Sequence, residues 1–292
     1  MSRPVNVIIP TLASRPRAAS LSRAIDSVVS QAGIESRVLV IINGTRFDPA
    51  LRTQLESDER LCVHYEALGS LPNAISVGRD RVTGTFFCFL DDDDELVPGS
   101  LAARLEIATG NPEYDFFAFN GYYREHPSGQ LRTYFDGFGV PPEAMFEALL
   151  RMNWLASCGG LFRTDRVPGE LFKDLPKYYE WTTVAFRLMA AGLQGRVVDQ
   201  PAFIVNETPD SLSRTDSFVE GAPHALLQLL ELGLPRRIRR GVREKLANAY
   251  HALSVLALER GDKALARRFH RQSLLASAAA VRRYLLYSRR LL

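Results

Sequence analysis

Short apolar runs alternate with stretches of helical periodicity over residues 1–110. The apolar runs predict four buried strands, at Val5–Pro10, Val38–Ile42, Leu61–Tyr65 and Thr85–Leu90. Between them, apolar residues recur at helical spacing in residues 21–29 and 71–82, which predicts amphipathic helices. Because helices that alternate with strands pack on a mostly parallel sheet, the pattern predicts an α/β fold.

The pattern changes from residue 113 onward. Strand-like pieces flank a turn at Pro127–Gly129, and helical periodicity returns in residues 142–152 and 178–191. We expect this part of the sheet to be mixed, with antiparallel strands.

After Pro223 the periodicity is helical throughout. Two amphipathic segments in Ala247–Leu274 are joined by Gly261-Asp262, in a pattern that resembles one tetratricopeptide unit. One such unit cannot bury its apolar face alone, so we predict a helical hairpin docked on the rest of the chain. The predicted organisation is an α/β domain over residues 1–222 and a helical C-terminal region over residues 223–292.

The predicted strands end in polar or glycine residues. Pro10-Thr11, Asn43-Gly44 and Asp91–Asp94 each stand at the end of an apolar run. In an open α/β sheet, ligands bind at the carboxyl ends of the strands. These three segments are therefore expected to converge on one crevice.

Five consecutive acidic residues, Asp91–Glu95, follow the last of these strands. Carboxylates this close repel one another unless a cation or hydrogen-bond donors offset the repulsion. Carboxylate oxygens suit Mg²⁺ or Mn²⁺, and such an ion would in turn hold a diphosphate. The alternative is a solvated acidic turn whose Asp94 caps a helix that begins near Pro98. Capping needs only one acid, which favours the metal site.

The net charge of +3 conceals an uneven distribution. Residues 236–292 hold 15 Lys and Arg against 3 Asp and Glu, whereas residues 1–235 hold 21 against 30. A segment this basic suits peripheral contact with an anionic membrane face or another polyanion, although we expect no nucleic-acid partner. A solvated helical surface explains the charge equally well, and composition does not separate the two.

The cysteines and the apolar runs bear on the compartment. Cys62, Cys88 and Cys158 are odd in number and far apart, which argues against a disulfide framework or a zinc site. A strand-like run begins at Val5 and leaves no room for a secretory signal peptide, and no apolar run is long enough to span a bilayer. We therefore expect a cytoplasmic protein. If the basic segment binds an anionic membrane, it would hold the protein at the inner face of that membrane.

Several motifs resemble those of the family 2 glycosyltransferases, over residues 5–213. Val7–Thr11 matches the family's opening strand, and Val40–Thr45 takes the place of its acidic nucleoside-binding element. Ser76–Asp80 lies where the family often has Ala-Arg-Asn, and Asp91–Asp93 is similar to its Asp-X-Asp motif. The resemblance implies a GT-A fold, which is a Rossmann-like nucleotide-diphospho-sugar transferase architecture with a mixed central sheet.

The resemblance also implies roles for single residues. Asp93 would bind the metal, and the implied donor or nucleotide contacts are Pro10, Thr11, Asn43, Arg79, Asp91 and Asp92. Arg79 would pair with the diphosphate, although an arginine that ends a helix is also often solvated. Asn-Gly is likewise an ordinary turn pair. The loop Arg15–Arg17 is expected to be solvated surface.

The segment Tyr179–Leu188 resembles the family's Glu-Asp helix. An inverting transfer needs a general base that takes the proton of the acceptor hydroxyl, and Glu180 is the candidate. The family's base is usually the second acid of the pair, but Trp181 stands there. Either Glu180 takes the role, or catalysis is impaired, or a carboxylate such as Asp174 contributes. An acid that only satisfies the helix dipole is the structural alternative.

Three further residues are candidates for contact with the sugar or the acceptor: Trp181, Gly159 and Gly160. A tryptophan face can stack on a sugar ring, and glycines permit a close backbone approach. A core tryptophan and a strand kink explain them about as well. The family commonly has a histidine just before Ser211–Ser213, where this chain has Thr208, and Arg214 is the candidate substitute.

The predicted function is an inverting, metal-dependent glycosyltransferase. It would use Mn²⁺ or Mg²⁺ to move a sugar from a nucleoside-diphosphate donor to a carbohydrate or lipid-linked acceptor, in bacterial surface polysaccharide or glycoconjugate synthesis. Sugar-nucleotide synthesis is disfavoured because Leu12–Pro16 is not a glycine-rich loop with a lysine. A non-catalytic nucleotide-sugar-binding or scaffold protein of a membrane-associated assembly is the alternative, favoured by Trp181 and Thr208.

Overall fold

The computed structural model of the chain describes residues 5–207, 216–278, 284 and 287. Thr208, Ser211–Ser213 and Arg214, which the family resemblance singled out, lie outside these residues. The same holds for four arginines of the basic segment: Arg282, Arg283, Arg289 and Arg290.

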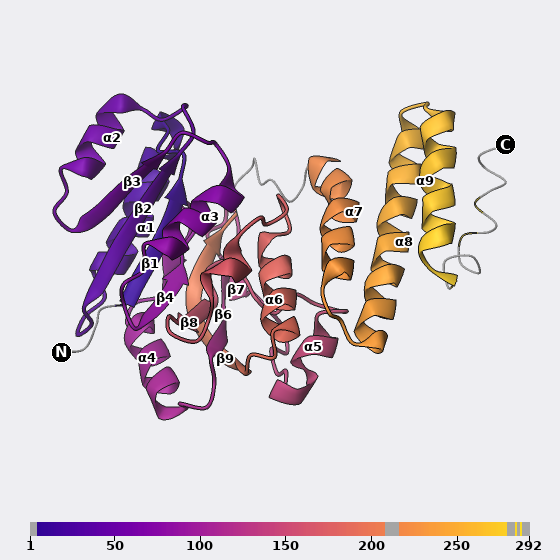
Figure 1. Cartoon of the computed structure of the whole chain (residues 1–292). Coiled ribbons are helices and arrows are strands. Elements are labelled where there is room, and N and C mark those ends of the chain that lie inside the picture. Colours follow the sequence, from indigo (N-terminus) through magenta and orange to yellow (C-terminus); the bar gives the residue numbers. More distant parts are fainter. Residues whose placement is uncertain (1–4, 208–215, 279–283, 285–286, 288–292) are drawn as a thin grey trace.

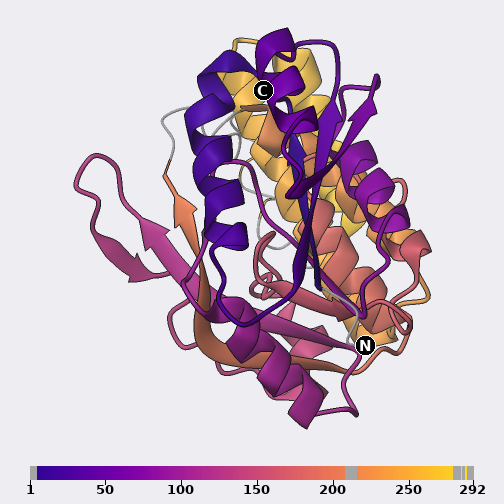
Figure 2. The same ribbon diagram turned by 90° about the vertical axis from the view of Figure 1, so that its left-hand side faces the viewer.

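The described residues form one nine-stranded mixed sheet with the order β3-β2-β1-β4-β8-β6-β9-β5, and β7 pairs with β6 (Figures 1 and 2). Its strands are β1 (Val5–Thr11), β2 (Ser36–Asn43), β3 (Leu61–Glu66), β4 (Phe86–Phe89), β5 (Glu95–Leu96), β6 (Phe116–Arg124), β7 (Leu131–Thr133), β8 (Gly160–Arg163) and β9 (Gly195–Asn206). The four strands predicted in the N-terminal part are confirmed as β1 to β4, which pair in parallel. The expected mixed part is also confirmed, because β8 pairs antiparallel with β4 and β6 while β9 runs parallel to β6.

Two hydrophobic clusters on opposite faces of the sheet form the core. Alternate residues of β1 divide between them, since Ile8 joins one cluster and Val7 and Ile9 join the other. The Ile8 cluster includes buried residues of α3 (Leu71–Asp80) and α6 (Glu180–Ala190), and the Val7 cluster includes those of α1 (Ala18–Val29) and α4 (Ser100–Gly110). Burial on both faces explains why these strands are continuous apolar runs.

The C-terminal region consists of α7 (Asp216–Glu231), α8 (Arg236–Glu259) and α9 (Lys263–Ala276), which follow α6 in a row leading away from the sheet (Figure 1). The predicted hairpin is confirmed, with Gly261 between α8 and α9 at a φ of 81°. The predicted boundary after residue 222 falls inside α7, because this helix continues through Pro223. No helix among the described residues is both long and apolar enough to cross a membrane.

Two local predictions differ from the structure. The helix expected over residues 142–152 is shorter, with a 3₁₀ turn η2 (Pro142–Ala144) and then α5 (Met145–Ala148). The chain leaves the helix early, and the indole N–H of Trp154 donates to the Met145 carbonyl. A further helix, α2 (Pro49–Glu56), was not predicted because it is short and only Leu55 in it is buried.

Candidate active site

Hydrogen bonds join Thr11, Asn43 and Asp92 at the carboxyl ends of β1, β2 and β4. Asn43 Nδ2 donates to the Thr11 carbonyl over 2.9 Å, and Thr11 Oγ1 donates to Asp92 Oδ2 over 2.6 Å. All three side chains are buried, and Pro10 precedes them in β1. Gly44, next to Asn43, has a φ of 82°, which a residue with a β-carbon rarely adopts. The predicted convergence of the strand ends is confirmed.

Arg17 neutralises two carboxylates of the acidic run. It lies in the 3₁₀ turn η1 (Arg15–Arg17) directly before α1, and its Nη1 lies 2.8 Å from Asp92 Oδ1 and 2.8 Å from Asp93 Oδ2. Burial lowers the pKa of Arg17, but the charges of Asp92 and Asp93 outweigh burial and raise it overall. Arg15 is exposed, as expected for this loop, whereas Arg17 is only partly exposed, because the loop after β1 folds over the end of β4.

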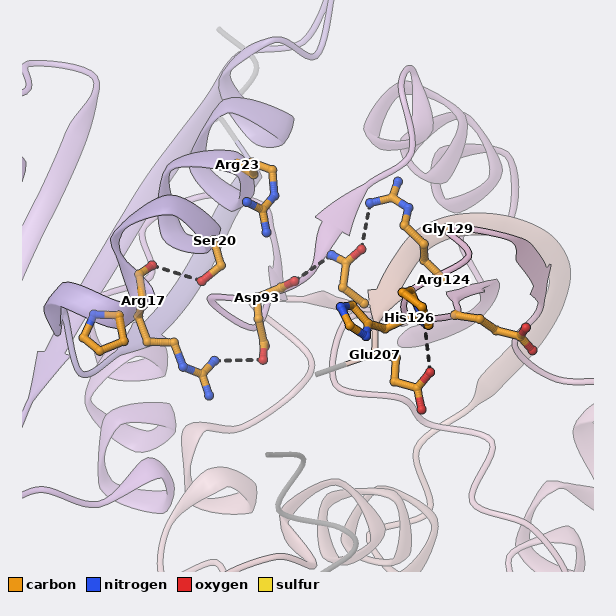
Figure 3. A pocket seen from close by; sticks show the side chains of 12 residues that line it. Arg17, Ser20, Arg23, Asp93, Arg124, His126, Gly129 and Glu207 are labelled. Atoms are coloured by element: carbon orange, nitrogen blue, oxygen red, sulfur yellow. Dashed lines mark hydrogen bonds and ion pairs between the residues drawn. The ribbon is translucent and has the colours of Figure 1, made fainter. Parts of the chain in front are cut away.

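A pocket of about 490 Å³ opens beside Asp93 (Figure 3). The start of α1, the turn between β6 and β7 and the end of β9 form its walls. Charges of both signs line it, including Arg17, Arg23 and Arg124 on one hand and Asp93 and Glu207 on the other. This mixed lining suits a polar ligand with several hydrogen-bonding groups.

Asn206, the last residue of β9, also forms hydrogen bonds with the acidic turn. Its backbone N–H donates to Asp94 Oδ1 over 3.0 Å, and its Nδ2 donates to the Asp93 carbonyl over 2.6 Å. The residue that caps α4 is Gly99 rather than Asp94. The alternative in which Asp94 serves as a helix cap is therefore excluded, because its carboxylate accepts hydrogen bonds from Asn206 and Cys158 instead.

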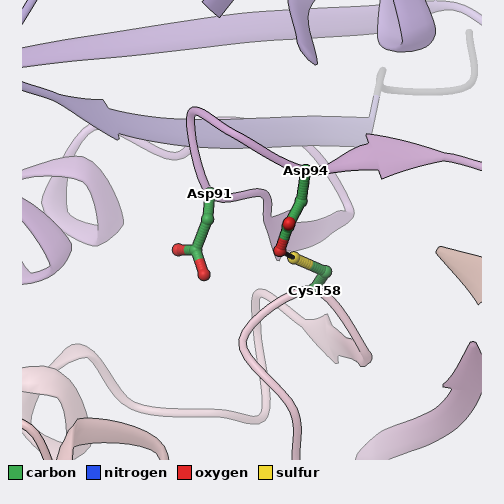
Figure 4. A group of neighbouring side chains, drawn as sticks. All are labelled: Asp91, Asp94 and Cys158. Atoms are coloured by element: carbon green, nitrogen blue, oxygen red, sulfur yellow. Dashed lines mark hydrogen bonds between the residues drawn. The ribbon is translucent and has the colours of Figure 1, made fainter. Parts of the chain in front are cut away.

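Asp91, Asp94 and Cys158 each offer a ligand atom within 4.8 Å of the other two (Figure 4). Cys158 Sγ donates to Asp94 Oδ2 over 3.2 Å. Burial and then the charge of Asp93 raise the pKa of Asp91 to about 7, against a hydrogen bond from Ser157. Burial, with Asp91 and Asp93 adding to it, also raises the pKa of Asp94 well above its usual range. Such a pair of carboxyls holds its protons unless a cation offsets its charge.

The chemistry of these donors fits a hard divalent cation. Carboxylate oxygens from Asp91 and Asp94 are the ligands that Mg²⁺ and Mn²⁺ prefer. The thiol of Cys158 is softer, and burial followed by the charge of Asp94 raises its pKa well above the ordinary value. Cys158 therefore remains a protonated donor to Asp94 and orients that carboxylate.

Glu180 is the first residue of α6. Its side chain is buried, with 6% of its surface exposed. Its charge is the smallest of the contributions that raise the pKa of Asp91. Burial raises the pKa of Glu180 itself, against backbone N–H groups of Glu180 and Tyr178 that hydrogen-bond to its carboxylate. A carboxylate held in this way is suited to accept a proton.

Comparisons with known proteins bear on this geometry. Residues 6–154 match the model of glycosyl transferase family 2. The chain belongs to this family. Two uncharacterized glycosyltransferases, from Rickettsia typhi and Rickettsia prowazekii, are each 25% identical to it over 118 residues, which is 40% of this chain. The match spans only 36% of the length of these two relatives.

Solved structures of S. aureus TarS have a similar fold. The 1–349 fragment in complex with UDP-GlcNAc has a TM-score of 0.62 and 15% identity, covering 99% of the family 2 chain and 88% of the fragment. The same fragment in complex with UDP has a TM-score of 0.54 and 16% identity, covering 97% and 91%. The expected GT-A fold, with a mixed sheet and a helical C-terminal region, is therefore confirmed.

The Asp-X-Asp motif of this family 2 chain divides between two sets of contacts. Asp91 lies with Asp94 and Cys158, whereas Asp93 pairs with Arg17 and lies outside that group. Its assignment as the metal ligand stays a prediction. The structure adds Asp94 to the candidate ligands.

Arg79 is not brought to the acidic cluster. Its Nη2 donates to the carbonyls of Thr164 and Val167, and its guanidinium lies 4.5 Å from the ring centroid of Phe87. Burial lowers its pKa, and the anions that oppose this effect are Asp80 and Glu170 rather than those of the acidic run. The expected diphosphate contact is corrected accordingly, because the last turn of α3 directs this side chain onto the loop after β8.

The three residues predicted to contact the sugar or the acceptor pack in the core. The Trp181 ring meets Phe89 edge to face at 4.9 Å, on the core side of α6. A β-carbon on Gly159 would lie 2.9 Å from the Phe119 carbonyl oxygen, and one on Gly160 would lie 2.4 Å from the Phe162 ring. The core explains all three residues, which leaves their contact with a ligand as a prediction.

Sequence reasoning missed Arg17, Asn206 and Cys158 as parts of the site. Asn206 and Cys158 carry no motif, and each meets the acidic turn through a strand pairing between distant segments. The one available signal was the position of Arg17, six residues after the end of the first strand, where a side chain can reach the neighbouring strand end.

Proposed function

We propose that this family 2 chain is an inverting, metal-dependent glycosyltransferase that moves a sugar from a nucleoside-diphosphate donor to an acceptor hydroxyl. The observation that carries the proposal is the pair of carboxylates from Asp91 and Asp94, within 4.8 Å of each other beside the ends of parallel strands. Membership of the family supports glycosyl transfer, and the complexes of TarS with UDP-GlcNAc and UDP support the donor class.

The donor nucleotide would lie across the ends of β1 and β2. Pro10, Thr11 and Asn43 form a rigid edge there, because the Thr11 and Asn43 side chains are fixed by their hydrogen bonds. Asp92 is held in the same network by Thr11 and Arg17. A pre-ordered polar edge binds a ribose or a base at a low entropic cost.

Asp91, Asp93 and Asp94 would hold the Mn²⁺ or Mg²⁺. When bound, the cation neutralises charge on the departing diphosphate. Asp91 and Asp94 supply buried carboxylates whose mutual repulsion a cation relieves, and Asp93 joins them once it leaves Arg17.

Glu180 would act as the general base. It takes the proton of the acceptor hydroxyl as that oxygen attacks the anomeric carbon on the face opposite the diphosphate, which inverts the configuration. Burial raises its pKa and so makes it a stronger base than a solvated glutamate. Asp174 stays the alternative carboxylate.

The acceptor is proposed to be carbohydrate or lipid-linked, at the inner face of a membrane. Arg236, Arg240 and Arg243 are exposed on one face of α8 and line a pocket of about 450 Å³ against the end of α9. Cosedimentation with phosphatidylglycerol vesicles, and none with phosphatidylcholine vesicles, tests this contact. Equal recovery with both would reject it.

A donor screen tests the enzymatic proposal. The chain is incubated with Mn²⁺ and a panel of nucleoside-diphosphate sugars, and release of nucleoside diphosphate is measured with and without candidate acceptors. We expect release with one donor and its loss in Asp91→Asn, while Asp165→Asn, which changes an exposed acid, retains it. Release that survives in Asp91→Asn would contradict the assignment.

A non-catalytic nucleotide-sugar-binding or scaffold protein is the second candidate. The observation that favours it is Trp181, which packs on Phe89 where the family usually has an acid. Calorimetry that shows metal-dependent nucleotide binding, with no hydrolysis or transfer of any donor, would select this candidate over the enzyme.

A further inference from the structure

A pocket of about 350 Å³ lies between α6, α7 and α8. Its lining comes from these three helices and from residues 149–153, and its described lining residues include none of Asp91–Asp94. The space exists because four positions that face it carry alanine: Ala222, Ala225, Ala249 and Ala252. It is therefore a separate cavity from the donor crevice.

The walls of this pocket are largely apolar. Phe186, Leu226 and Leu229 belong to the buried core and line its floor. The ring of Tyr179 stacks on Phe218 with centroids 4.8 Å apart, which closes one side. A ligand that fills the pocket must therefore carry an apolar body.

Two cations line the same pocket. Lys245 of α8 is partly buried, and Arg151 follows α5. Neither forms an ion pair with a carboxylate among residues 5–207 and 216–278, in contrast to Arg240 and Arg237 nearby on α8. Burial lowers the pKa of Lys245, and no anion opposes the effect. A partly buried ammonium without a counterion favours an anionic ligand.

Thr183 adds a polar group that lacks a partner. Its side chain is 1% exposed and lines the pocket, and its Oγ1 is buried without a hydrogen bond in the described part of the chain. Buried hydroxyl groups normally form a hydrogen bond, so this one is available to a ligand atom that reaches it.

From these observations we propose that the pocket binds an amphiphile with one anionic head group, a carboxylate or a phosphate monoester, on an apolar chain. Lys245 and Arg151 hold the head group, Thr183 supplies a hydrogen bond, and the space beside the four alanines takes the chain. The site is separate from the proposed transfer reaction, and binding there can be measured whether or not the chain is an enzyme.

Calorimetry and thermal unfolding of the full chain test the site. Decanoate and decyl phosphate are the probes, used below their micellar concentrations, with 1-decanol and inorganic phosphate as partial probes. We expect saturable binding and a raised unfolding midpoint with the two complete amphiphiles, and weaker effects with either partial probe. Lys245→Met should weaken binding about tenfold, since it removes a charge-assisted contact. Lys263→Met, which changes an exposed lysine on α9, should leave it unchanged.

Two further variants test the site independently of Lys245. Ala249→Trp fills the pocket and should abolish binding. Arg151→Gln changes an exposed side chain of the pocket and should weaken binding, which tests the anionic head group if Lys245→Met fails to fold. Equal responses to decanoate and 1-decanol would overturn the anionic head. Binding that is unchanged in Ala249→Trp, or no binding of either amphiphile, would overturn the site.

Discussion

Arg17 and Asp93 form an ion pair in which Arg17 Nη1 lies 2.8 Å from Asp93 Oδ2. The same nitrogen lies 2.8 Å from Asp92 Oδ1, so one guanidinium serves two carboxylates. A divalent cation on Asp93 has to compete with this internal cation, because both need the same oxygens. On the proposed function, the affinity for metal would then depend partly on Arg17, which is not itself a ligand.

Replacing Arg17 tests that competition. Arg17→Met should bind Mn²⁺ about fivefold more tightly, because a partly buried ion pair of this kind contributes on the order of 1 kcal/mol. Calorimetric titration with Mn²⁺ in the absence of nucleotide measures it. Arg15→Met, in the same turn and exposed, is the control. Unchanged or weaker Mn²⁺ binding in Arg17→Met would mean that Arg17 only holds the loop.

The raised pKa of Asp91 predicts how stability depends on pH without metal. The pKa is about 7 in the folded chain and about 3.9 in the unfolded chain. Between these values the folded state keeps a proton that the unfolded state has released. The free energy of unfolding should therefore fall as the pH rises from about 4 to about 7, and level off above.

Urea unfolding in a chelator, at pH values on either side of this window, measures the effect. In Asp91→Asn the decline should be smaller, because the neutral amide does not titrate. Mn²⁺ should restore stability above the window in the unaltered chain by binding the ionised carboxylates. A decline of the same size in Asp91→Asn would show that other groups are responsible.

Glu180→Gln tests the base. Loss of a general base lowers the turnover rate by about a hundredfold to ten-thousandfold, while an isosteric amide keeps the shape of the site. We expect the rate of transfer to fall by this amount with little change in donor affinity. Steady-state kinetics and calorimetry measure the two quantities, and Glu170→Gln, an exposed change, is the matched control. Near-normal turnover in Glu180→Gln would transfer the role to another carboxylate.

Arg79→Met should affect stability rather than donor binding. The substitution removes the hydrogen bonds to the carbonyls of Thr164 and Val167, and charged hydrogen bonds of this kind are worth about 1.5–3 kcal/mol. Urea unfolding should show a loss of that order, and Arg46→Met, on the surface, should show almost none. A large loss of nucleotide affinity in folded Arg79→Met would return this residue to the donor site.

Gly160→Ala should destabilise the fold. The new β-carbon would lie 2.4 Å from the Phe162 ring, and overpacking of a core costs about 1–3 kcal/mol. Gly110→Ala is the control, because nothing lies within 4 Å of a β-carbon there. Thermal unfolding compares the two variants. A variant at Gly160 that keeps full stability but loses sugar binding would support the role first expected for this glycine.

The N-terminal part of the fold was predictable because its signal is local. Strands β1, β2 and β4 are apolar runs buried on both faces, and Thr11, Asn43 and Asp92 lie at or just after their ends. The contacts of Asn206 were not predictable, because they depend on the antiparallel pairing of β9 with β5 across more than a hundred residues. A single polar residue at a strand end has no periodicity that would indicate its partner.

For Arg79, the sequence motif led to a contact that the structure does not have. Its position after an amphipathic helix matches a motif, but the motif does not fix the direction of the side chain. Packing decides that direction, because the Phe87 ring and two backbone carbonyls of the segment after β8 surround the guanidinium.

The hydrophobic cluster that holds Ile8 and Phe87 also contains Leu229 of α7 and Val242 of α8. At Gly241, α8 approaches the segment after α5 so closely that a β-carbon would lie 2.5 Å from the Leu150 side chain. A chain that ended at residue 222 would therefore expose the apolar residues of this cluster to water. Exchanging α7 and α8 with those of a relative would succeed only if the residues that pack against these helices were exchanged as well.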